Sequence, residues 1–110
     1  MIRIALGAAA VLGVMVGEAH AEFQTGNDLY RLCASVGDFH KGMCLGFIEG
    51  VADTMTSIRT GQGQRSCIPR EVEADQMREV VVKYLTEHPE DRNYSAASNA
   101  LVAIAKAWPC

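Results

Sequence analysis

Residues 42–55, GMCLGFIEGVADTM, decide the fold that this sequence predicts. Apolar residues recur through this stretch with the period of an α-helix, and the pattern continues to Ile58. We therefore predict a long helix over about residues 41–59, with one apolar stripe that faces the core. The predicted stripe consists of Cys44, Ile48, Val51, Met55 and Ile58.

The same helix carries three glycines spaced four residues apart, Gly42, Gly46 and Gly50. A glycine inside a helix is destabilising by about 1 kcal/mol relative to alanine. At about 100° per residue, the three glycines fall on the side opposite the core stripe. The missing side chains favour close packing of another backbone there, either the N-terminal helix folded back or a second subunit. The alternative is that the glycines only relieve crowding beside a disulfide.

The sequence TGND at residues 25–28 is typical of a capping box, in which Thr25 accepts a hydrogen bond from the backbone N–H of Asp28. It predicts a first helix over about residues 26–33. The sequence SVGDFHKG, residues 35–42, is expected to break the chain before the long helix begins.

A third helix is predicted to open at Pro69 and to stop before Pro89, because the residue before a proline is disfavoured in a helix. Glu71, Glu73 and Asp75 lie near its expected start, where acidic side chains interact favourably with the positive end of the helix dipole. The side of this helix that is expected to face the core holds Met77, Val81, Tyr84 and Leu85.

A fourth helix is predicted over about residues 95–108. No stretch alternates in the manner of a half-buried strand, so we predict an all-α fold, a small four-helix domain stapled by disulfides. The apolar stripe expected on the fourth helix is Ala97, Leu101, Ile104 and Trp108.

The first 21 residues have the features of a secretory signal peptide: an early Arg3, an apolar stretch, and AHA ending at Ala21. Cleavage after Ala21 would leave residues 22–110 as one helical domain in the periplasm, without a membrane anchor. The formal net charge of −3 makes nucleic acid an unfavourable partner.

Four cysteines lie in residues 22–110, and an even count in a short exported chain indicates disulfides. The long helix separates its two ends by about 27 Å, whereas a disulfide joins Cα atoms about 4.4–6.8 Å apart. Cysteines at the same end must therefore pair. We predict the pairs Cys33–Cys44 and Cys67–Cys110.

The sequence gives little support for a catalytic or a metal-binding site. The domain lacks a C-x-x-C pair, a G-x-S-x-G motif and an H-E-x-x-H motif, and only His40 and His88 could supply imidazole. Paired cysteines also leave no nucleophilic thiol. We predict a protein that is not an enzyme and needs no cofactor.

Four segments resemble the Rap/Tai family of immunity proteins: FQTGNDLYRLC, CLGFIEGVADTM, CIPREVEADQMREVVVKYLTEHPEDR and LVAIAKAWPC. The resemblance spans nearly all of residues 22–110 and includes the four cysteines, but Glu73 replaces a frequent hydroxyl residue before the third helix. It implies a periplasmic, mainly homodimeric inhibitor of a peptidoglycan amidase toxin, a cysteine endopeptidase delivered by type VI secretion. The alternative is a small periplasmic stress or acid-resistance chaperone, which would unfold at low pH.

An inhibitor must fit a concave active site, so the segments between helices are the natural partner contacts. Pro89 stiffens the sequence EHPEDRN, residues 87–93, and a preordered segment loses less entropy on binding. We therefore predict partner contacts at Glu90, Asp91 and Arg92, although the same sequence also fits a plain solvated turn. The second candidate is TGQGQRS, residues 60–66, with Gln62, Gln64 and Arg65.

Overall fold

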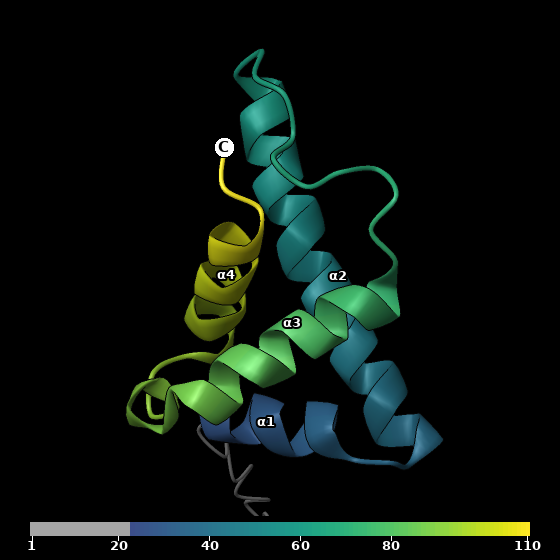
Figure 1. Cartoon of the computed structure of the whole chain (residues 1–110), viewed down its shortest axis with the longest axis vertical. Helices are drawn as coiled ribbons and strands as arrows, with labels where there is room; N and C mark the ends of the chain where they lie inside the picture. Colours follow the sequence, from purple (N-terminus) through teal and green to yellow (C-terminus); the bar gives the residue numbers. More distant parts are fainter. Residues whose placement is uncertain (1–22) are drawn as a thin grey trace, which may run out of the picture.

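The computed structural model describes residues 23–110, and Figure 1 shows an arrangement of helices joined by turns. The predicted all-α fold with two disulfides is confirmed. None of the helices in the described part is both long and apolar enough to cross a membrane. The elements are α1 (Gly26–Ala34), α2 (Asp38–Gly61), α3 (Ala74–Glu87), the 3₁₀ turn η1 (Pro89–Asp91) and α4 (Ala96–Ala107).

Helix α1 begins where the capping box predicts. The Asp28 N–H donates to Thr25 Oγ1 at 3.3 Å, and the Thr25 N–H donates to Asp28 Oδ2 at 2.9 Å. Two backbone donors at the start of α1 are thereby satisfied, which fixes where the helix begins.

Helix α2 is longer than predicted at both ends, because it starts at Asp38 and runs to Gly61. The break between α1 and α2 covers only residues 35–37, whereas the prediction extended it over residues 35–42. Gly37 caps the helix without a side-chain hydrogen bond, so the usual capping signal was missing from the sequence.

The predicted core stripe of α2 is right in its first half and wrong at its end. Cys44 and Ile48 are buried, but Ala52 continues the buried line, while the Ile58 side chain is 58% exposed. Val51 and Met55 are only partly buried. The end of α2 extends past the other helices in Figure 1, and Ile58 lines an open groove between α2 and α4 instead of the core.

Helix α3 starts at Ala74, so the predicted start at Pro69 is wrong. Residues 69–73 form a turn in which the Val72 N–H donates to the Pro69 carbonyl at 3.2 Å. The predicted core side is confirmed for Met77, Val81 and Leu85, which are buried, whereas Tyr84 is half-buried.

Helix α4 buries a face next to the one predicted. Ala97 and Leu101 are exposed and only Ile104 of the predicted stripe is fully buried, with Trp108 half-buried. Small residues bring α4 close to its neighbours, a pattern that a search for large apolar residues overlooks. The residues buried on α4 are Ala96, Asn99, Ala100, Ala103 and Ile104.

The two disulfides join the predicted partners. Cys33 bonds Cys44 and Cys67 bonds Cys110, each with Cα atoms 5.0 Å apart. The first pair is fully buried, whereas Cys67 is half-buried and Cys110 is exposed. No cysteine in residues 23–110 is free.

Candidate functional site

The turn between α3 and α4 holds the three residues predicted to contact a partner, Glu90, Asp91 and Arg92. In Figure 1 it is the green turn at the lower left, beside α1. Pro89 opens η1 at a position where a helix needs no backbone N–H, so the proline shapes the turn without losing a hydrogen bond.

The two acids of this turn are hydrogen-bonded to groups of the same domain, one within the turn and one on the last turns of α3. The Tyr84 hydroxyl donates to Asp91 Oδ2 at 2.9 Å, and His88 Nδ1 lies 3.1 Å from Glu90 Oε1, where the carboxylate accepts. The rings of Tyr84 and His88 stack with centroids 4.5 Å apart. A backbone hydrogen bond within Glu90 and the bond to His88 lower the pKa of Glu90. Burial, and then the bond to Asp91, raise the pKa of Tyr84.

Arg92 contacts the domain itself. Its Nε donates to the Leu85 carbonyl at 2.6 Å, and its guanidinium carbon lies 4.0 Å from the centroid of the Tyr30 ring. Arg92 therefore ties the turn to the end of α3 and to α1. Of the three predicted contacts, Glu90 presents the most exposed side chain, at 65%.

A close backbone approach lies behind this turn, at a glycine that sequence reasoning did not single out. A Cβ added to Gly26 would meet Asn99 Nδ2 at 2.7 Å and Arg92 Cα at 2.8 Å. The Gly26 N–H also donates to the Tyr94 carbonyl at 2.8 Å. The start of α1 thus packs directly on the 92–95 backbone, and only glycine fits there.

His88, Glu90 and Asp91 each place one potential metal-ligand atom within 4.8 Å of the others. Each carboxylate in this cluster already accepts a hydrogen bond from His88 or Tyr84. These bonds explain the cluster as the internal structure of the turn. What the turn offers outward is an acidic, preordered surface.

The second predicted segment, residues 60–66, is more ordered than its glycines suggested. Arg59 Nε donates to the Arg65 carbonyl at 2.9 Å, and Gly63 adopts a left-handed φ of 73° that favours glycine. A cavity of about 820 Å³ separates this segment from the side of α2. Gln64 and Arg65 line it, whereas Gln62 caps the end of α2.

The predicted glycine strip faces open space within residues 23–110. A Cβ added to Gly42, Gly46 or Gly50 would meet no atom within 4 Å, so the expected close backbone is not α1. Gly46 and Gly50 instead line an apolar groove of about 530 Å³ between α2 and α4. Its other lining residues include Phe47, Val51, Ala97 and Leu101.

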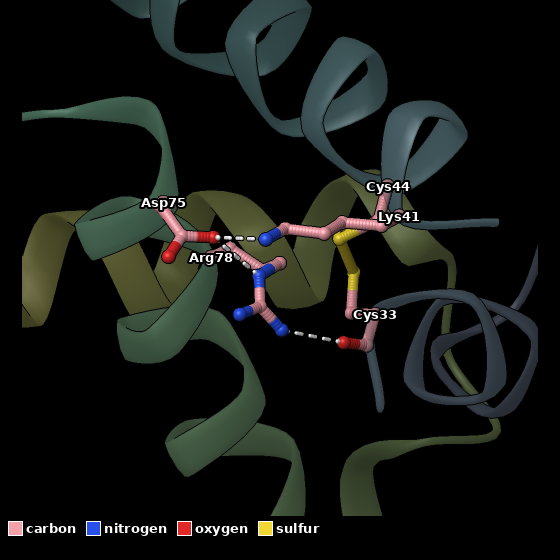
Figure 2. The surroundings of a disulfide bond; sticks show 5 residues. All are labelled: Cys33, Lys41, Cys44, Asp75 and Arg78. Carbon is pink, nitrogen blue, oxygen red and sulfur yellow. Dashed lines mark hydrogen bonds and ion pairs between the residues drawn. A yellow bond between two sulfur atoms is a disulfide. The ribbon is translucent and has the colours of Figure 1, made fainter. Parts of the chain in front are cut away.

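Figure 2 shows how the buried disulfide is held from α3. Arg78 Nη1 donates to the Cys33 carbonyl at 3.0 Å, while Arg78 Nε donates to Asp75 Oδ1 at 2.9 Å. Lys41 Nζ lies 3.3 Å from the same carboxylate oxygen. Hydrogen bonds from Arg78 and Lys41 lower the pKa of Asp75. We call Lys41, Asp75 and Arg78 the clamp, because together they join α3 to both helices that the Cys33–Cys44 bond links.

Comparison with known proteins assigns the domain to a family. The family model described as Rap1a immunity proteins matches residues 25–110, which is nearly all of the described chain. No curated protein and no solved structure matches the chain.

Proposed function

The chain belongs to the Rap1a immunity protein family, and from that premise we propose that it neutralises a peptidoglycan amidase toxin. Family membership implies immunity to a type VI effector by binding rather than catalysis. The amidase, a cysteine endopeptidase of the cell wall, is the toxin class that the sequence resemblance suggests. The observation that carries the proposal is a family match that spans all four helices and both disulfides.

The proposed compartment is the periplasm, where the amidase would meet its substrate. Disulfides form and persist in that oxidising environment, and both pairs are formed here. Residues 1–21, proposed to be a signal peptide cleaved after Ala21, lie outside the described residues. The domain is then residues 22–110.

The proposed inhibition is occlusion of the toxin's active-site cleft by a preordered surface. The turn at Glu90 and Asp91 suits this role, because its internal hydrogen bonds and the Arg92 anchor leave little entropy to lose on binding. Its acidic charge would also speed encounter with a basic enzyme. Arg92 supports the turn from within, so Glu90 is the residue to test.

We expect Glu90→Ala to weaken toxin binding by about tenfold, the loss of one charged contact of about 1.4 kcal/mol. The probe is the cognate amidase of the proposal, purified with its nucleophilic cysteine changed to alanine. Calorimetry gives the affinity, and growth of cells that export the active amidase gives the protection. Glu71→Ala, an exposed acid outside the turn, is the matched control. Equal affinity of both variants would move attention to Gln64 and Arg65.

We also propose that the domain forms a homodimer through the groove between α2 and α4. The groove is mainly apolar, and two glycines along it would let a helix of a second copy approach closely. Gly50→Leu would fill the groove and should convert a dimer to a monomer in sedimentation velocity. Gly42→Leu lies on the same strip outside the groove and should leave the dimer intact. A monomeric wild type would refute the dimer.

A further inference from the structure

Three apolar side chains protrude where α1 turns into α2. Val36 is 100% exposed, Phe39 is 75% exposed and Met43 is 43% exposed. We call these three residues the α1–α2 tip. Figure 1 places it at the lower right corner of the molecule, where the chain turns sharply between the two helices.

The tip is held rigidly although it is exposed. The Cys33–Cys44 disulfide closes the segment that contains Val36 and Phe39. Within the segment, Ser35 Oγ accepts from the Gly37 N–H at 3.3 Å and lies 3.2 Å from His40 Nδ1. The clamp contacts this segment at two points, because Arg78 donates to the Cys33 carbonyl and Lys41 pairs with Asp75.

Folding alone does not explain these side chains, because water already surrounds most of their surface. A rigid aromatic group with apolar neighbours is the usual anchor of a protein interface, since it buries a large area with little loss of conformational entropy. Exposed apolar clusters of this kind mark interaction surfaces.

The position of the tip at a sharp turn of the chain, with its three side chains exposed, indicates the kind of partner. Two copies that met tip to tip would touch over a small area, well below the roughly 800 Å² per partner of a standard interface. A concave surface can surround the tip on several sides and bury most of it. The occupant that fits is therefore a protein with an apolar hollow.

We infer that the α1–α2 tip is an apolar anchor that inserts into a hollow of the toxin, an inference that rests on the proposed function. The tip and the acidic turn at Glu90 lie near opposite ends of α1, whose nine residues span about 13 Å. One partner can therefore contact both. The acidic turn would contribute charge and encounter rate, and the tip would contribute the buried apolar area.

The test replaces the tip without touching the core. Val36→Ser with Phe39→Ser should weaken binding of the same cysteine-to-alanine amidase by about 100-fold, as expected for the loss of an aromatic anchor and its neighbour. Val36→Ile with Phe39→Leu changes the same positions but keeps them apolar, and its loss should stay within about tenfold. Circular dichroism melting and non-reducing peptide mapping should show both variants folded, with the Cys33–Cys44 bond intact, because the changed side chains are exposed.

The outcomes separate this inference from the proposed function. If the wild type binds the amidase and the serine variant binds equally well, the tip is not a contact and only the inference fails. An equal loss in the serine and the apolar variants would show that exposed apolar character is not what the toxin recognises, and would also overturn it. If the wild type itself neither binds nor protects, the proposed function fails and the inference falls with it.

Discussion

The two disulfides occupy unlike surroundings, and the difference separates a packed region of the molecule from an open one. Cys33–Cys44 is fully buried and is held by the clamp, whereas Cys67–Cys110 joins a half-buried residue to an exposed one. We call α1, α3, residues 88–95 and α2 up to Ala52 the packed region. The open region is the rest of α2 with residues 62–73.

Loop length predicts that Cys67–Cys110 stabilises the fold more, whereas burial predicts that Cys33–Cys44 does. On the chain-entropy model, a loop of 11 residues contributes about 3 kcal/mol and one of 43 residues about 4 kcal/mol. The chain-entropy model takes no account of the residues around the sulfur atoms. Removing buried sulfur atoms also leaves a cavity, which adds to the loss at Cys33–Cys44 alone.

The largest expected effect is the loss of the buried disulfide. Cys33→Ala with Cys44→Ala should lower the free energy of unfolding by about 4–5 kcal/mol, from loop entropy and the cavity together. Cys67→Ala with Cys110→Ala should lower it by about 4 kcal/mol or less, because its surroundings are already open to water. Urea denaturation followed by circular dichroism measures both. A larger loss for the exposed pair would mean that loop entropy outweighs burial.

Two glycines of the packed region give a second comparison, between a close backbone approach at Gly26 and open space at Gly46. Gly26→Ala should destabilise by about 2–3 kcal/mol, because its methyl group would overlap the backbone of Arg92. Gly46→Ala should stabilise the monomer by about 0.5–1 kcal/mol, since alanine favours the helix and meets no neighbour within one chain. Thermal melts of dilute protein measure both. Destabilisation by Gly46→Ala would show that another backbone does pack on the strip.

The sequence predicts the packed region well, because local signals and long-range contacts agree there. The capping box starts α1, the cysteine positions select the disulfide pairs, and Met77, Val81 and Leu85 mark the buried side of α3. Each signal depends on residues that lie close along the chain or on one helix face.

At other positions, in both regions, the sequence leaves the surroundings of a residue open, because the missing information lies in distant neighbours. Periodicity places Ile58 on the core stripe, but Ile58 lines an open groove between α2 and α4 and stays largely exposed. The bond from Arg92 to the Leu85 carbonyl could not be predicted from the sequence, whereas the contact of Arg92 with a partner stays a prediction. The exposure of Phe39 was equally hidden, because the segment read only as a helix break. Spacing along the chain cannot tell whether a neighbour is present on a given face.

Two arginines, Arg92 in the packed region and Arg59 in the open region, allow the same comparison with smaller expected changes in stability. Each donates through Nε to one backbone carbonyl. Arg92→Ala should destabilise by about 2 kcal/mol, from the loss of a charged hydrogen bond and of the contact with the Tyr30 ring. Arg59→Ala removes an exposed bond to the Arg65 carbonyl and should change stability by less than about 1 kcal/mol. Chemical denaturation of the two variants gives the values. Equal losses would mean that burial does not strengthen the Arg92 contacts.

The smallest expected effect is the acid dependence that the clamp confers. Hydrogen bonds from Arg78 and then Lys41 lower the pKa of Asp75 below its ordinary value of 3.8. A carboxyl group whose pKa is lowered by folding stabilises the fold above its unfolded pKa, and this contribution disappears as the pH falls through the folded pKa. The melting temperature of the wild type should therefore fall below about pH 3.8. Asp75→Asn should melt lower than the wild type at neutral pH, and the difference should shrink in acid.

Glu71→Gln is the control, because it removes a carboxylate of the open region that makes no salt bridge within residues 23–110. Its melting curve should follow the wild type across the pH series. The series also distinguishes the two functions that the sequence suggests. An inhibitor should stay folded down to the pH at which the clamp titrates, since the two disulfides still hold the chain. An acid-resistance chaperone should expose its core well above that pH, and dye binding to apolar surface between pH 4 and 6 would favour it.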